Sequence, residues 1–137
     1  MTRTRLSLVA VLAVAGLALS GCGGGNDEEG ATDTRTTTTP AVGSTLQGSV
    51  GPGFEISLST PDGQSISTLA PGSYTIEVDD MASNHNFHLT GPGDVDVSTE
   101  VGGEGTETFQ VTLEPGSYSF VCDPHSSSLN GSFEVTG

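Results

Sequence analysis

The chain has 137 residues, with 17 acidic residues against 3 basic ones and a formal charge of −14 at neutral pH. No Lys or Arg follows Arg35, so the rest of the chain lacks cations that could neutralise phosphates, and we expect no nucleic-acid partner. The acidic excess suggests instead a basic docking partner or a saline habitat; a surface that only keeps the protein soluble is the alternative.

Residues 1–21 have the layout of a secretory signal peptide. Two arginines precede a short apolar run, Leu6 to Ser20, which is too short to favour a permanent transmembrane helix. The run ends in LSGC, which resembles the bacterial lipobox, and this resemblance implies that Cys22 is acylated and begins the mature protein. We therefore expect a lipoprotein anchored outside the cytoplasm, at the cell surface or on the periplasmic side, without spanning the membrane. An ordinary signal followed by a chance cysteine is the alternative.

Residues 22–45 combine Gly, Thr and acidic residues with almost no large apolar side chain. Such a segment cannot bury enough surface to offset the entropy of ordering, so we interpret it as a flexible tether. Residues 46–137 are then one small domain, near the lower end of what a single hydrophobic core supports.

The domain is punctuated by Gly and Pro and lacks a 3.6-residue apolar period, which predicts strands and turns instead of helices. The candidate strands are 46–50, 54–59, 74–79, 86–90, 106–113, 117–122 and 131–135. About seven to eight short strands with turn signals between them are typical of an all-β sandwich.

Two segments repeat one pattern: TLAPGSYTIEVDD at 68–80 and TLEPGSYSFVCDP at 112–124. In each, PGSY predicts a tight turn that opens a strand, so Tyr74 and Tyr118 are expected to be packing and corner residues. Strand alternation puts Cys122 on the same face as Tyr118, at the end of an inward-facing row.

Cys122 is followed three residues later by His125, with Pro124 stiffening the turn between them. A thiolate and an imidazole on one short loop can meet one metal ion, although C-x-x-H alone is a weak signal. The other two histidines, His85 and His88, lie three apart in SNHNFHL. On a strand they face opposite sides, so at most one of them is expected to be a ligand.

Together these motifs resemble a known family. A His-Asn pair, a domain-length gap, Y-x-F-x-C-x-P-H and a terminal G-x-F-x-V strand are similar to the small blue-copper cupredoxins, of the plastocyanin and amicyanin type. The similarity covers residues 46–135, nearly the whole predicted domain. It implies a Greek-key β-sandwich that binds one copper ion, cycling between Cu(II) and Cu(I).

Carried over to this sequence, the resemblance implies that His85, Cys122 and His125 are the equatorial copper ligands. It implies that Asn86 braces the ligand loop and that His88 is a non-ligand. Two imidazoles and one thiolate in a trigonal arrangement are the donor set of blue-copper electron-transfer sites. The alternative is that the cysteine is an inert core thiol and the histidines are turn and strand-end residues.

The sequence departs from the family at the position of the axial methionine, where it has Leu129. In one reading copper is three-coordinate under an apolar lid formed by Leu129, which favours Cu(I). In a second, an oxygen of the Asn130 side chain or of the Asn84 backbone takes the axial place. In a third, the site is degenerate and binds metal poorly or not at all. We favour the first two, because all three equatorial residues are retained.

The function expected from these residues is that of a one-electron carrier with no enzymatic activity, because three histidines cannot build the further copper centres of multicopper enzymes. The resemblance places electron entry at the exposed edge of His125, and the acidic surface predicts a redox partner with a basic docking face. The alternatives are a copper storage or delivery protein and a metal-free interaction module. An enzyme that uses Cys122 and His125 as nucleophile and base lacks an evident orienting group. A disulfide between Cys22 and Cys122 is conceivable if Cys22 is not acylated.

Overall fold

The computed structural model of the protein describes residues 39–137. The expected signal peptide, the acylated Cys22 with its alternative disulfide, and most of the expected tether lie outside the described residues. Within residues 39–137, no helix is both long and apolar enough to cross a membrane.

The described residues form nine β-strands and one short 3-10 helix. They are β1 (Thr45–Val50), β2 (Ile56–Ser59), β3 (Thr68–Leu69), β4 (Gly72–Asp80), β5 (His88–Gly91), β6 (Val95–Ser98), β7 (Gly105–Leu113), β8 (Gly116–Val121), η1 (Asp123–His125) and β9 (Asn130–Val135). The all-β prediction is confirmed, but the expected number of strands was too low. It omitted β3, which has only two residues, and β6, whose sequence VDVS alternates apolar and polar residues but is only four residues long.

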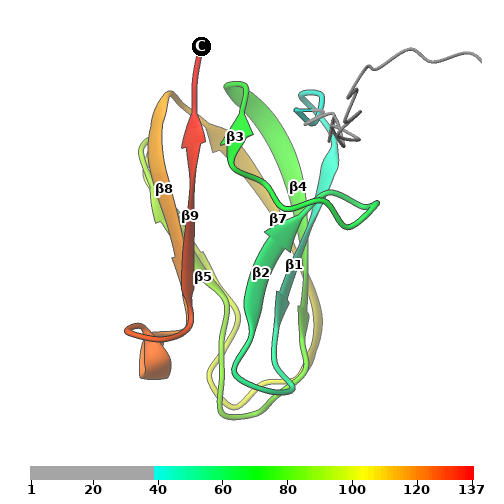
Figure 1. The fold of residues 1–137 in the computed structure, drawn as a ribbon, viewed down its shortest axis with the longest axis vertical. Helices are drawn as coiled ribbons and strands as arrows, with labels where there is room; N and C mark the ends of the chain where they lie inside the picture. The colour runs from blue at the N-terminus through cyan, green and yellow to red at the C-terminus, as the bar shows by residue number, and fades with distance from the viewer. Residues whose placement is uncertain (1–38) are drawn as a thin grey trace, which may run out of the picture. The chain divides into compact units, whose positions relative to one another are not determined.

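The strands form two sheets, with the orders β2-β1-β4-β7 and β3-β9-β8-β5-β6. Figure 1 shows these sheets face to face, with η1 and the β1–β2 turn at the same end of the sandwich. The neighbours β1 and β4 are parallel, although most other pairs are antiparallel. This pairing of strands distant in sequence agrees with the expected Greek-key sandwich.

The core lies between the sheets and follows strand alternation. Along β4, Tyr74, Ile76 and Val78 are buried while the residues between them face outward. Along β8 the buried row continues from Tyr118 through Phe120 to the residue after the strand. Burying side chains of this size contributes about 1.5–3 kcal/mol each to folding.

Both repeat tyrosines have the packing and corner roles expected of them. The Tyr74 hydroxyl donates to the Ala70 carbonyl at 3.0 Å, and the Tyr118 hydroxyl donates to the Pro92 carbonyl at 3.0 Å. The Tyr118 ring stacks on Phe133 with the ring centroids 5.1 Å apart.

The pairing of β5 with β8 positions the histidine and cysteine motifs. The first residue of β5, His88, is opposite the last residue of β8, Val121. Because the two strands are antiparallel, the chain that enters β5 and the chain that leaves β8 meet at one end of the sheet. Residues 85–87 therefore lie beside residues 122–125, despite their separation in sequence.

Candidate metal centre

Three side chains with metal-binding atoms meet at this end of the sandwich: His85, Cys122 and His125. The His85 Nδ1 and His125 Nδ1 atoms are 3.1 Å apart, and the Cys122 Sγ atom lies 3.5 Å from the first and 3.6 Å from the second. A point in the plane of these three atoms would lie about 2.0 Å from each, which is close to the length of metal–imidazole bonds in proteins. The triangle therefore fits one small metal ion in a trigonal arrangement.

Cys122 and His125 are positioned by a short closed loop, residues 122–129, which we call the metal loop. The Cys122 amide donates to the Leu129 carbonyl at 2.9 Å, so the two ends of the loop are joined. Inside the loop, the His125 amide donates to the Cys122 carbonyl at 2.9 Å, forming η1 with Pro124 in its first turn. These backbone bonds fix the two side chains relative to each other.

His85 lies on the loop that joins β4 to β5, and its amide donates to the Ala82 carbonyl at 3.0 Å. Next to it, Asn86 is buried and bonds to Asp123 of the metal loop in both directions. The Asn86 Nδ2 donates to Asp123 Oδ2 at 2.7 Å, and the Asp123 amide donates to Asn86 Oδ1 at 2.8 Å. Asn86 thus joins the two loops that carry the three candidate ligands.

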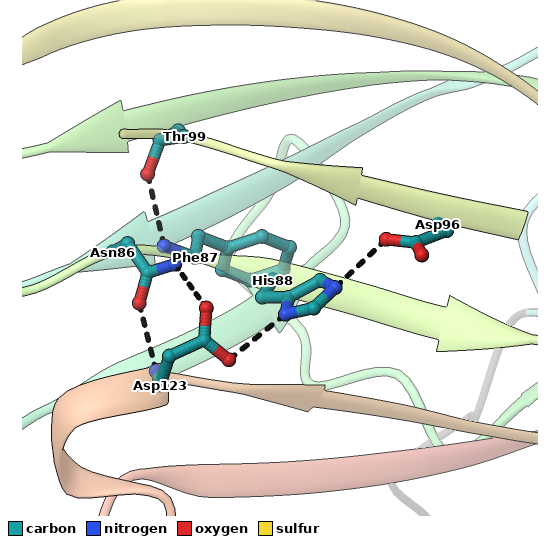
Figure 2. Close-up of polar contacts among 6 residues, drawn as sticks. All are labelled: Asn86, Phe87, His88, Asp96, Thr99 and Asp123. Atoms are coloured by element: carbon teal, nitrogen blue, oxygen red, sulfur yellow. Dashed lines mark hydrogen bonds and ion pairs between the residues drawn. The ribbon is translucent and has the colours of Figure 1, made fainter. Parts of the chain in front are cut away.

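A second set of bonds joins the same β4–β5 loop to Thr99 and, through Thr99, to Asp80 at the end of β4; Figure 2 shows the first of these bonds. The Phe87 amide donates to Thr99 Oγ1 at 2.9 Å, and the Thr99 hydroxyl donates to Asp80 Oδ2 at 2.8 Å. Asp80 and Thr99 are both buried. The backbone beside His85 is therefore anchored to β4 as well as to the metal loop.

The candidate ligands differ in exposure. Cys122 and His85 are 0% and 1% exposed, whereas His125 is half-buried at the surface. Cys122 is a free thiol in the part of the chain that the structure describes. Of the three candidate ligands, His125 alone is in part exposed to solvent.

Phe54 covers the centre from the β1–β2 turn, a role that the sequence did not suggest. Its ring lies edge-on to His85 and His125, with ring centroids 5.4 Å and 4.9 Å apart, while 63% of the residue remains exposed. The expected strand 54–59 begins only at Ile56, because the GPGF turn occupies the preceding residues. The sequence signal that could have indicated this role is a large apolar side chain directly after Gly-Pro-Gly, that is, in a turn instead of a strand.

Comparisons with known proteins agree with the geometry. No protein-family model matches the sequence, and no curated protein sequence matches it either. Among solved structures, the copper protein rusticyanin matches with a TM-score of 0.53 and 16% identity, over 72% of this chain and 81% of rusticyanin. The chain has the cupredoxin fold. Auracyanin from the photosynthetic bacterium Roseiflexus castenholzii matches with a TM-score of 0.50 and 16% identity, over 71% of this chain and 100% of auracyanin. A rusticyanin variant with leucine in place of a methionine matches with a TM-score of 0.50 and 20% identity, over 72% of this chain and 80% of the variant.

On this cupredoxin fold, the residue at the expected axial position is apolar and enclosed. Leu129 is 2% exposed, and with Phe54 it borders a groove that none of the three candidate ligands lines. Asn130 is exposed, and its side-chain amide donates to the Ser126 carbonyl at 2.8 Å. Asn84 is also exposed. Leu129 is buried, as an apolar lid requires, while its role at the centre and the identity of the ligands stay predictions.

His88 lies apart from the other two histidines. This agrees with the implication of the resemblance that His88 is not a ligand. It begins β5, and its ring lies between two carboxylates (Figure 2). The Nδ1 atom is 2.9 Å from Asp123 Oδ1, and the Nε2 atom is 2.9 Å from Asp96 Oδ1. The hydrogen bond to Asp123, helped by that to Asp96, raises the pKa of His88 above its usual value even though burial opposes this. The same bond, together with that from Asn86, lowers the pKa of Asp123.

Proposed function

We propose that the protein is an extracytoplasmic one-electron carrier that holds one copper ion and is tethered to a membrane through Cys22. The observation that carries this proposal is the triangle of His85 Nδ1, Cys122 Sγ and His125 Nδ1, whose sides of 3.1, 3.5 and 3.6 Å suit a trigonal centre. Two imidazoles and a thiolate are a donor set that suits copper and is used in electron transfer. When bound there, copper supplies the exchange of one electron between Cu(II) and Cu(I).

The residues around the triangle have the arrangement that such a carrier needs. A ligand set that barely moves between oxidation states keeps the reorganisation on electron transfer small, and the closed metal loop and Asn86 provide that rigidity. Phe54, which lies edge-on to both imidazoles, and the buried Leu129, as the proposed lid, would limit the access of water to the centre. The hydrophobic surroundings of a metal help to set its potential, and a lid without a sulfur donor favours Cu(I).

The proposed partner is a redox protein with a basic face. The half-buried edge of His125 is the route for the electron, since the other two candidate ligands are enclosed. Residues 39–137 contain no Lys or Arg, so the domain presents a negative field to an approaching partner. Such fields raise the rate of encounter between opposite charges, and salt lowers that rate. In this proposal the protein is a carrier and not an enzyme.

The test is the visible absorption spectrum of the purified protein after addition of Cu(II), with Cys122→Ser as the matched control. We expect an intense thiolate-to-copper charge-transfer band that is absent in the variant, and a reversible one-electron couple in voltammetry. Copper binding without such a couple would favour storage or delivery of copper. No copper binding, measured after oxidation to exclude Cu(I), would leave a metal-free interaction module.

A further inference from the structure

His88 is enclosed by two carboxylates that come from different parts of the fold. Asp96 lies on β6, the edge strand of its sheet, and Asp123 lies on the metal loop. The two ring nitrogens of His88 are each 2.9 Å from one carboxylate oxygen. The side chain is one-quarter exposed, so the bridge is shielded in part from solvent. No hydrogen bond or ion pair joins the His88 ring to any other titratable group of residues 39–137.

This geometry suits a positively charged imidazole. An ionised carboxylate only accepts hydrogen bonds, so both ring nitrogens must carry a proton to bond to both partners. A doubly protonated ring is an imidazolium cation. The raised pKa of His88, due first to its bond with Asp123, agrees with this state. Since residues 39–137 contain no Lys or Arg, His88 is the one side chain of these residues outside the triangle that can be a cation.

The carboxylate of Asp123 links this cation to the candidate ligands. Its Oδ1 atom accepts from His88 and its Oδ2 atom accepts from Asn86, so both of its oxygens are held. Asp123 directly follows Cys122, and Asn86 directly follows His85. One carboxylate therefore connects β6 and β5 to both ligand loops, through side chains that Figure 2 shows in one continuous chain of bonds.

We propose that His88 is a positioning residue of the metal centre, a fixed cation that holds the metal loop to β6 and offsets the charge of Asp123, the residue that follows Cys122. The proposal rests on the proposed function, because it assigns His88 a role at the same centre. A nearby cation favours the less positive oxidation state, Cu(I), and a fixed loop favours metal binding in both states.

The test compares His88→Gln with Asp96→Asn. The first variant removes the cation and leaves Asp123 uncompensated, so we expect copper affinity to fall about 10–100-fold, as for other residues that support metal ligands. We also expect Cu(I) binding to fall by up to about tenfold more than Cu(II) binding, which lowers the potential by up to about 59 mV. The second variant removes an anion and keeps the ring, so the potential should rise. Glu77→Gln, which neutralises an exposed carboxylate on the other sheet, should leave the potential unchanged.

If the reduction potential falls in His88→Gln and rises in Asp96→Asn, the result would support a role through charge. Looser packing alone would not make the direction of the shift depend on the sign of the charge that is removed. Shifts of the same sign, or no shift in either variant, would overturn the proposal while the absorption band of the unaltered protein upholds the proposed function. The nitrogen NMR signals of His88 in metal-free protein at neutral pH provide a readout independent of copper. Two protonated ring nitrogens would support the bridge, and a neutral ring would overturn it even if the protein bound no copper.

Discussion

Replacing Asn86 by alanine removes the side chain that joins the two ligand loops. The bond from Nδ2 to the Asp123 carboxylate, at 2.7 Å, is of the charged kind that contributes about 1.5–3 kcal/mol, and the bond from the Asp123 amide, at 2.8 Å, contributes about 1 kcal/mol. Asn86 is buried, so the truncation also leaves a small cavity. We expect the free energy of unfolding of the metal-free protein to fall by about 2–4 kcal/mol.

The assay is urea unfolding of metal-free Asn86→Ala beside the unaltered protein, followed by competition for copper with a chelator. Gln64→Ala is the matched control, because it removes another amide-to-carboxylate bond, 3.0 Å to Asp62, from an exposed turn. The control should change stability by no more than about 0.5 kcal/mol. Copper affinity of Asn86→Ala should fall about 10–100-fold. A stability loss below about 1 kcal/mol would refute the argument that Asn86 holds the two loops together.

Three further changes test other parts of the structure. Leu129→Met should lower the reduction potential in voltammetry, because a sulfur donor at the axial position stabilises Cu(II); an unchanged or higher potential would contradict the lid. The raised pKa of His88 means that its bridge stabilises the metal-free fold fully below the unfolded value, about 6.5, and that this contribution is lost as pH rises through the higher folded value. The melting temperature of the unaltered protein should therefore exceed that of His88→Gln by more at pH 6 than at pH 9, whereas an equal gap would count against the bridge. Gly131→Ala should cost about 1–3 kcal/mol in denaturant unfolding, since the new Cβ would lie 2.2 Å from Phe120 Cζ, and full stability would show that the ring can move.

The candidate ligands were accessible from the sequence because each belongs to a local pattern. Cys122 ends an alternating row, and His125 follows it on the same turn, so both could be assigned to one loop. Choosing His85 over His88 required the family resemblance. The structure supplies the physical reason: His88 is already within β5 and opposite Val121, whereas His85 lies on the loop before the strand.

The contacts around the ligands could not be predicted in the same way, because they join residues distant in sequence. Asp96 and Asp123 looked like ordinary members of an acidic surface until the pairing of β5 with β6 and β8 brought them to His88. Phe54 was assigned to a strand because alternation in FEISLS outweighed the preceding turn. Strand pairing and turn geometry decide these positions, and neither is encoded within a short window of sequence.

The bond between the Cys122 amide and the Leu129 carbonyl has a consequence for how such a protein can evolve. It closes the metal loop at its base, so substitutions of the three serines 126–128, which lie outside the ligand pair and the Asp123 contacts, need not disturb the register of β8 and β9. Variation there could retune the affinity or potential of the centre while selection on folding acts mainly on the two sheets. The fold thus separates loop residues whose substitution can change the partner or the reduction potential from residues of the two sheets that keep the chain folded.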